Sequence, residues 1–188
     1  HGDNRHIGDN SISCPCSSNE KMFVIADGVD SVILAAREQI RKQVDHIKIM
    51  GSGGVASPSD PIESIQFTFD EIKAVVDEAK RFNKYVLCHA YNPISIINAV
   101  TAGVRTIEHG NLIDDDSAKS MKKAKSFLVP TLVTYSKIVK EGEKNGLPGY
   151  HIQKGKEVER YGLRSLDIAK RYGIKMGFGT DLFKNPSN

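Results

Sequence analysis

The sequence of 188 residues contains no tryptophan, no C-x-x-C motif and no apolar run near the length of a membrane helix, which is about 18 residues. Its three cysteines, Cys14, Cys16 and Cys88, cannot all pair, and the lack of C-x-x-C argues against a zinc ribbon or a thioredoxin-type redox site. The net charge of +3 comes without long basic runs, which argues against nucleic-acid binding. We therefore expect a globular domain with no nucleic-acid partner and no membrane partner.

The chain begins at His1 without a methionine, and both of its ends are abrupt. The sequence therefore leaves a preceding segment open and neither supports nor excludes a signal peptide. The odd number of cysteines favours the cytoplasm, while export stays open. Cys88 lies in an apolar stretch beside a histidine, and we predict that it is a small buried hydrophobe.

Strand and helix patterns alternate along the chain. Short apolar strands are predicted at residues 46–50, 85–90, 104–108, 127–132 and 174–179. Helices are predicted at residues 27–43, 68–81, 93–103, 114–125 and, with a break near "NGLPG", 135–172. This alternation predicts parallel βαβ units, which fit either a doubly wound sheet or part of a β/α barrel. No G-x-G-x-x-G follows a strand, which argues against the nucleotide-binding form of the doubly wound sheet.

Candidate functional residues stand at the carboxyl ends of the predicted strands, where β/α barrels carry their chemistry. These residues are Lys48, His89, Tyr91, His109 and Asp181. Ordinary structural explanations exist for four of them: the two histidines as core or surface residues, Asp181 as a turn cap, and Lys48 as a strand residue facing water. Their shared position instead favours a metal site, because imidazole and carboxylate bind zinc and similar divalent metals.

Lys48 raises a question of its own, since "DHIKIMGSGG" reads as a buried strand with a lysine in its middle. Either the strand alternates and Lys48 faces water, or the lysine lies inside and is chemically altered. An ammonium inside costs several kcal/mol unless it is paired. A neutral lysine amine can take up carbon dioxide to form a carbamate, whose two oxygens can bridge two cations. Such a bridge would make a buried lysine reasonable, because the metals compensate its charge.

The sequence resembles the amidohydrolase superfamily of metal-dependent hydrolases, in its imidazolonepropionase-like branch. The motifs that carry the resemblance are "IKIMGSGGVASPSDPI", "HAY", "GVRTIEHGNLID", "VPTLVTY" and "GFGTD". Within that branch it looks similar to Xaa-Pro dipeptidases (prolidases) and Xaa-Arg/Lys carboxypeptidases. The resemblance implies an α/β fold, a partial (β/α)8 TIM barrel covering roughly strands 3/4 to 8. Residues 1–188 would then be a fragment of a single barrel domain, with the N-terminal strands and a small β-domain absent.

The resemblance also implies a role for each strand-end residue. A carboxylated Lys48 would bridge two zinc ions, and His89 and His109 would bind one of them. Asp181 would bind the other zinc ion and act as the proton shuttle. Tyr91 would hydrogen-bond the scissile carbonyl oxygen.

The activity that the resemblance implies is hydrolysis of an amide bond by a metal-bridged hydroxide, with an Xaa-Pro dipeptide as the expected substrate. His1, in "HGD", matches a position that helps to bind substrate in this branch. The alternatives are a cyclic amide, an Xaa-Arg/Lys peptide, or a non-catalytic or inactive barrel fragment. The family's first strand carries an H-x-H pair, and this chain has none. The sequence leaves open whether the protein forms a homo-oligomer.

Other polar residues have less specific expectations. We predict that His46 and His151 lie on the surface and that Glu108 faces away from the side of its neighbour His109. The loop "GSGGVASPSD" either covers the site and shapes the substrate pocket or is a plain connector.

Overall fold

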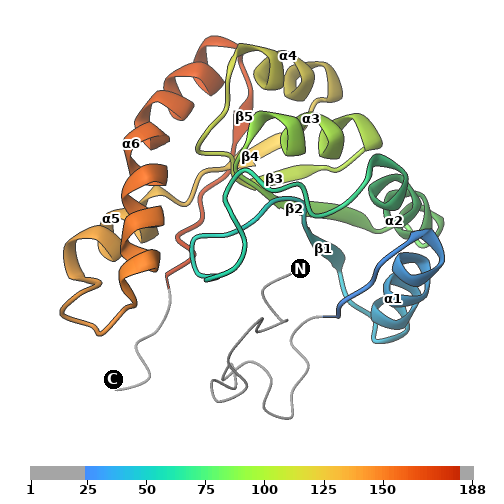
Figure 1. The fold of residues 1–188 in the computed structure, drawn as a ribbon. Coiled ribbons are helices and arrows are strands. Elements are labelled where there is room, and N and C mark those ends of the chain that lie inside the picture. The colour runs from blue at the N-terminus through green and yellow to red at the C-terminus, as the bar shows by residue number, and fades with distance from the viewer. Residues whose placement is uncertain (1–23, 183–188) are drawn as a thin grey trace.

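The computed structural model describes residues 24–182 of the chain, and helices alternate with strands along this range (Figure 1). The strands are β1 (His46–Met50), β2 (Tyr85–Ala90), β3 (Thr106–His109), β4 (Phe127–Val129) and β5 (Lys175–Met176). The helices are α1 (Val29–Arg41), α2 (Phe69–Arg81), α3 (Pro93–Ala102), α4 (Asp115–Ala124), α5 (Leu132–Glu141) and α6 (Gly149–Arg171). None of these helices is long and apolar enough to span a bilayer.

The strands form one parallel sheet, and their order in the sheet, β1-β2-β3-β4-β5, is their order along the chain. A doubly wound sheet reverses its strand order at a switch point, whereas a barrel adds each strand on the same side of the last. Helices α1 to α4 form a row along one side of the sheet (Figure 1). The described chain is therefore part of a β/α barrel, as predicted, and the doubly wound alternative is excluded.

Local sequence signals place the helix ends. Thr68 caps α2 and forms a capping box with Glu71, in which each side chain bonds the other residue's backbone. Asn92 caps α3, Pro93 occupies its first turn, and Gly103 ends it in the left-handed conformation. Each helix thus returns the chain to the opposite end of the sheet, so the strands present their carboxyl ends at one common edge.

The main core lies between the sheet and the row of helices. Alternation in β1 buries Ile47 and Ile49 in this core and places Lys48 on the opposite face of the strand. Cys88 of β2 is completely buried there, and burial raises the pKa of its thiol to about 12. The prediction that Cys88 is a small buried hydrophobe is confirmed.

Three strands depart from their predicted bounds. β3 begins and ends later than predicted, β5 has only two residues, and β4 ends three residues early. Pro130 has no amide hydrogen to give to the sheet, and Thr131 turns the chain away with a φ of 46°. Helix α5 therefore begins at Leu132, earlier than the predicted start at Tyr135.

A second, smaller core lies at the carboxyl edge of the sheet. It joins the loop of residues 51–66 to the end of β2, to α5 and to α6, and its buried members are Val55, Ile62, Tyr91, Tyr135, Ile138 and Val158. Most residues between Gly51 and Ile62 are buried. The loop is therefore a packed part of the fold rather than a plain connector.

The two histidines predicted on the surface differ. His46 is exposed, as predicted. The prediction for His151 is wrong, since its side chain is only 8% exposed. His151 lies in the first turns of α6, the helix that packs along α5, and this packing covers a helix face whose polar sequence gave no sign of burial.

Candidate active site

The carboxyl edge of the sheet brings His89 and His109 together. β2 pairs with β3 in the register His89 to Glu108 and Ala90 to His109, so the two imidazoles come from neighbouring strands. Their ring centroids lie 4.7 Å apart in an edge-to-face arrangement, and both side chains are buried. Two buried imidazoles at such a distance are suited to bind one metal ion together.

His109 belongs to a buried network of hydroxyl groups. Its Nδ1 lies 2.7 Å from Thr131 Oγ1 and 2.8 Å from the Tyr135 hydroxyl. The Tyr135 hydroxyl in turn lies 2.7 Å from that of Tyr91. Such contacts fix the orientation of an imidazole and leave Nε2 as the nitrogen that faces away from the network, which is the usual arrangement of a metal-binding histidine.

His89 is oriented by the loop of residues 51–66. Its Nε2 lies 2.9 Å from the carbonyl oxygen of Gly53. Because a carbonyl oxygen only accepts, Nε2 carries the hydrogen, and the lone pair of the neutral ring lies on Nδ1. The loop therefore selects the tautomer of His89.

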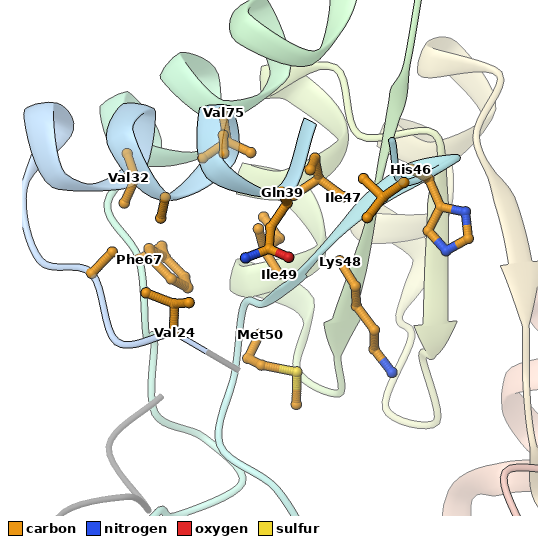
Figure 2. A pocket seen from close by; sticks show the side chains of 14 residues that line it. Val24, Val32, Gln39, His46, Ile47, Lys48, Ile49, Met50, Phe67 and Val75 are labelled. Carbon is orange, nitrogen blue, oxygen red and sulfur yellow. The ribbon is translucent and has the colours of Figure 1, made fainter. Parts of the chain in front are cut away.

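Lys48 lies on the strand face opposite the main core, and its side chain is exposed in the described chain. Figure 2 shows the side chain pointing away from α1, with its amine beyond the strand. Of the two alternatives for Lys48, the alternating strand is therefore correct. Within residues 24–182 the lysine is not buried. The positive charge of Lys48 nevertheless acts on the pKa of both His109 and Asp181, so it faces the site.

Asp181 follows β5 and is exposed at the end of the described chain. Burial raises the pKa of its carboxyl group, and the charge of Lys48 opposes this shift. Its φ is 51°, and that of His109 is 74°. Left-handed backbone conformations at residues other than glycine cost of order 1 kcal/mol or more, and they concentrate at functional sites.

The buried groups of the site are held in their neutral forms. Burial, together with electrostatic interactions with His89 and Lys48, lowers the pKa of His109 well below its usual value. Burial and the neighbouring Tyr135 raise the pKa of Tyr91 well above its usual value. At neutral pH, His109 is therefore an unprotonated base and Tyr91 is a hydrogen-bond donor.

The structure thus brings together Lys48, His89, Tyr91, His109 and Asp181 at one edge of the sheet, while His1 lies outside the described residues. Within residues 24–182, no three His, Cys, Asp or Glu side chains are close enough to hold a metal ion by themselves. A metal here would therefore need the altered Lys48 or ligands from elsewhere.

Thr131 and Tyr135 belong to the site but were not among the residues predicted from the sequence. Both lie in the motif "VPTLVTY", where Thr131 precedes α5 and Tyr135 lies one turn further on. The signal that could have found them is their place at or just after the end of a predicted strand, where the other site residues also lie. Glu108 is bonded by the hydroxyl of Thr106 and takes no part in the network around His109.

A cavity of about 450 Å³ lies between β1 and α1 (Figure 2). Lys48 is among its lining residues, whereas His89, Tyr91, His109 and Asp181 are not. Its lining is mostly apolar and includes Val32, Phe67 and Val75. β1 is an edge strand of the described sheet, and the cavity lies along it. The cavity is therefore mostly apolar packing surface along β1, and it meets the candidate site only at Lys48.

Fold and site together define a β/α-barrel protein with a histidine, tyrosine and carboxylate centre at the carboxyl ends of its strands. Residues 9–187 match the sequence profile of the amidohydrolase family. The chain belongs to the amidohydrolase family.

Named relatives agree with this assignment. The chain is 33% identical to ochratoxinase from Aspergillus niger over 157 residues, which are 84% of this chain and 32% of that protein. It is 49% identical to a prolidase solved in complex with N-methylphosphonate-L-proline, covering 97% of this chain and 45% of the other, with a TM-score of 0.89. A Xaa-Pro dipeptidase with methionine bound in its active site is 31% identical, covering 85% of this chain and 40% of the other, with a TM-score of 0.76. The chain thus spans a third to a half of the length of these relatives.

Proposed function

We propose that the protein containing this chain is a metal-dependent hydrolase that cleaves the amide bond of a small substrate, and that the substrate is an Xaa-Pro dipeptide. The observation that carries the proposal is the buried network of Tyr91, Tyr135 and His109 beside His89 and Asp181. It combines paired imidazoles, a carboxylate and a neutral hydroxyl donor within one site.

The donor set fits a metal. The contacts of His89 with Gly53 and of His109 with Tyr135 orient one ring nitrogen of each histidine and leave the other as the ligand. Lys48 would complete this site as a carbamate: its neutral amine adds to carbon dioxide, a nitrogen–carbon bond forms, and one proton is released. Asp181 would be a ligand of a second metal. The chemistry that the metals supply when bound is to polarise the substrate carbonyl and to lower the pKa of water towards about 7.

Residues of the chain carry out the proton transfers and stabilise the negative charge that develops on the substrate. The carboxylate of Asp181 accepts the proton of the attacking water and then gives it to the leaving amine. The hydroxyl of Tyr91 donates a hydrogen bond to the carbonyl oxygen as negative charge develops there. Tyr135 positions Tyr91 through the contact of 2.7 Å between their hydroxyls.

The relatives support the choice of substrate. The prolidase that is 49% identical to this chain was solved with a phosphonate analogue carrying L-proline, and a Xaa-Pro dipeptidase is 31% identical. The relationship to ochratoxinase supports amide hydrolysis and leaves the side chains of the substrate open. A cyclic amide or an Xaa-Arg/Lys peptide is therefore the second candidate.

The H-x-H pair is the part of the family resemblance that the 188 residues do not contain. The second metal of the proposal, next to Asp181, depends on ligands beyond this chain. Sequencing the gene upstream of His1 tests this point. An H-x-H at the end of an apolar strand supports the enzyme, whereas a complete protein that starts at His1 favours a binding or inactive barrel.

Hydrolysis is tested on the complete gene product with a panel of Xaa-Pro, Xaa-Arg and Xaa-Lys dipeptides, cyclic amides and ochratoxin. We expect preferential release of proline. Lys48→Ala should lose both metal content, measured by mass spectrometry, and hydrolysis. Lys175→Ala, which removes an exposed lysine from β5, is the matched control and should keep both. Full metal content and rate in Lys48→Ala would contradict the bridging role.

A further inference from the structure

Lys154 of α6 reaches the loop of residues 51–66 and contacts three of its backbone carbonyl groups. Its Nζ lies 3.2 Å from the oxygen of Gly54, 2.7 Å from that of Ser57 and 2.5 Å from that of Asp60. The contacts join segments 94 to 100 residues apart in the sequence. An ammonium group has three hydrogens to donate, so its donors match these three acceptors.

The carbonyl groups of the loop need such a cation. Three carbonyl oxygens that converge on one point carry partial negative charges that repel one another, and a cation at that point turns the repulsion into attraction. The loop has little room to relax, because a Cβ atom added at Gly53 would lie 1.9 Å from the carbonyl oxygen of Pro61. The shape of the loop therefore depends on the charge at its centre.

The same loop contacts the candidate active site at three points. The carbonyl oxygen of Gly53 accepts the hydrogen bond from His89 Nε2. The hydroxyl oxygen of Ser52 accepts a hydrogen bond of 3.0 Å from the backbone N–H of Tyr91. The backbone N–H of Val55 bonds the hydroxyl of Tyr91. A change in the path of the loop therefore reaches both the imidazole of His89 and the hydroxyl of Tyr91.

We propose that Lys154 is a positioning residue that holds the loop of residues 51–66 in the shape that orients His89 and Tyr91. This proposal rests on the proposed function in one respect: the oriented groups serve amide hydrolysis. The three contacts of Lys154 with the loop, called the clamp below, are a property of the folded chain and are measurable without substrate or metal.

The main variant is Lys154→Met, which keeps the length and the apolar stem and removes the ammonium group. Lys156→Met is the matched control, because Lys156 is an exposed lysine on the same helix. Hydrogen exchange of the loop amides is measured in metal-free protein, together with ¹⁵N chemical shifts of the imidazole of His89 at pH 8. Kinetic constants for the best dipeptide are measured in the metal-loaded protein.

In Lys154→Met, we expect loop amides to exchange at least about tenfold faster and the His89 signals to change from the pure Nε2–H tautomer to a mixture. We expect kcat to fall about 10- to 100-fold with KM little changed, since displaced catalytic groups impair the reaction more than binding. Lys154→Arg should recover only part of this loss, because a planar guanidinium cannot direct its donors at three converging carbonyls. Lys156→Met should match the wild type in every measurement.

Exchange rates and His89 signals in Lys154→Met equal to those of Lys156→Met would overturn the proposal. If Lys154→Met does not fold, the same comparison is made with Lys154→Arg, and wild-type exchange, His89 signals and kcat in that variant would also overturn it. Faster exchange and altered His89 signals in a protein that hydrolyses no dipeptide would support the clamp and refute the proposed function, so the two failures are distinguishable.

Discussion

Tyr135→Phe is the sharpest test of the buried hydroxyl network. The substitution removes one oxygen and keeps the ring, whose side chain is 2% exposed. That oxygen contacts two groups, the hydroxyl of Tyr91 and Nδ1 of His109. Each hydrogen bond contributes about 0.5–1.5 kcal/mol net, so the loss is about 1–3 kcal/mol. The loss stays in this range because His109 keeps Thr131 and Tyr91 keeps the amide of Val55 as partners.

The loss is measured by urea unfolding and by calorimetry. A loss of about 2 kcal/mol lowers the melting temperature of a protein of this size by about 4–8 °C. Tyr150→Phe is the control, because Tyr150 is an exposed tyrosine of α6 and its variant should stay within about 0.5 kcal/mol of the wild type. The double variant Tyr91→Phe/Tyr135→Phe should cost less than the sum of the single variants by about 0.5–1.5 kcal/mol, because their shared bond counts in both.

Two results would refute this reasoning. The first is equal stability of Tyr135→Phe and Tyr150→Phe, which would mean that the hydroxyl of Tyr135 contributes nothing. The second is strict additivity in the double variant, which would mean that the hydroxyls of Tyr91 and Tyr135 do not interact.

Three further predictions concern other parts of the chain. Cys88, whose thiol pKa is raised to about 12, should resist alkylation at pH 8 until the protein unfolds, as read by peptide mapping; fast labelling of the folded protein would contradict its burial. Burial lowers the pKa of His151, so the unfolded chain binds a proton at higher pH than the folded chain, and the free energy of unfolding falls as the pH drops below about 6.5. Between pH 7 and 5.5, the free energy of unfolding of His151→Leu should therefore fall less than that of the wild type. Gly53→Ala should cost about 1–3 kcal/mol, because its Cβ would collide with Pro61, while Gly149→Ala, with nothing within 4 Å, should cost nothing; equal stability of the two would argue against the tight loop.

Most of the architecture could be predicted from local sequence signals. The bounds of β1 and β2 agree with the apolar runs at 46–50 and 85–90, and the capping box at Thr68 starts α2 as expected. These features depend on neighbours in the chain, so a single sequence contains them. The ends of β4 and β5 were less predictable, because strand length depends on which neighbouring strand offers hydrogen-bonding groups.

The sequence by itself determined the strand-end residues, since the period of a strand and the position of the following loop place Lys48, His89 and His109 at one edge of a parallel sheet. Only the tertiary structure decided that Lys48 is exposed, that Tyr135 joins Tyr91 to His109, and that the amine of Lys154 bonds the loop of residues 51–66. Burial and long-range hydrogen bonds depend on which distant segments pack together. That information lies in the shape of the folded chain and in no local stretch of residues.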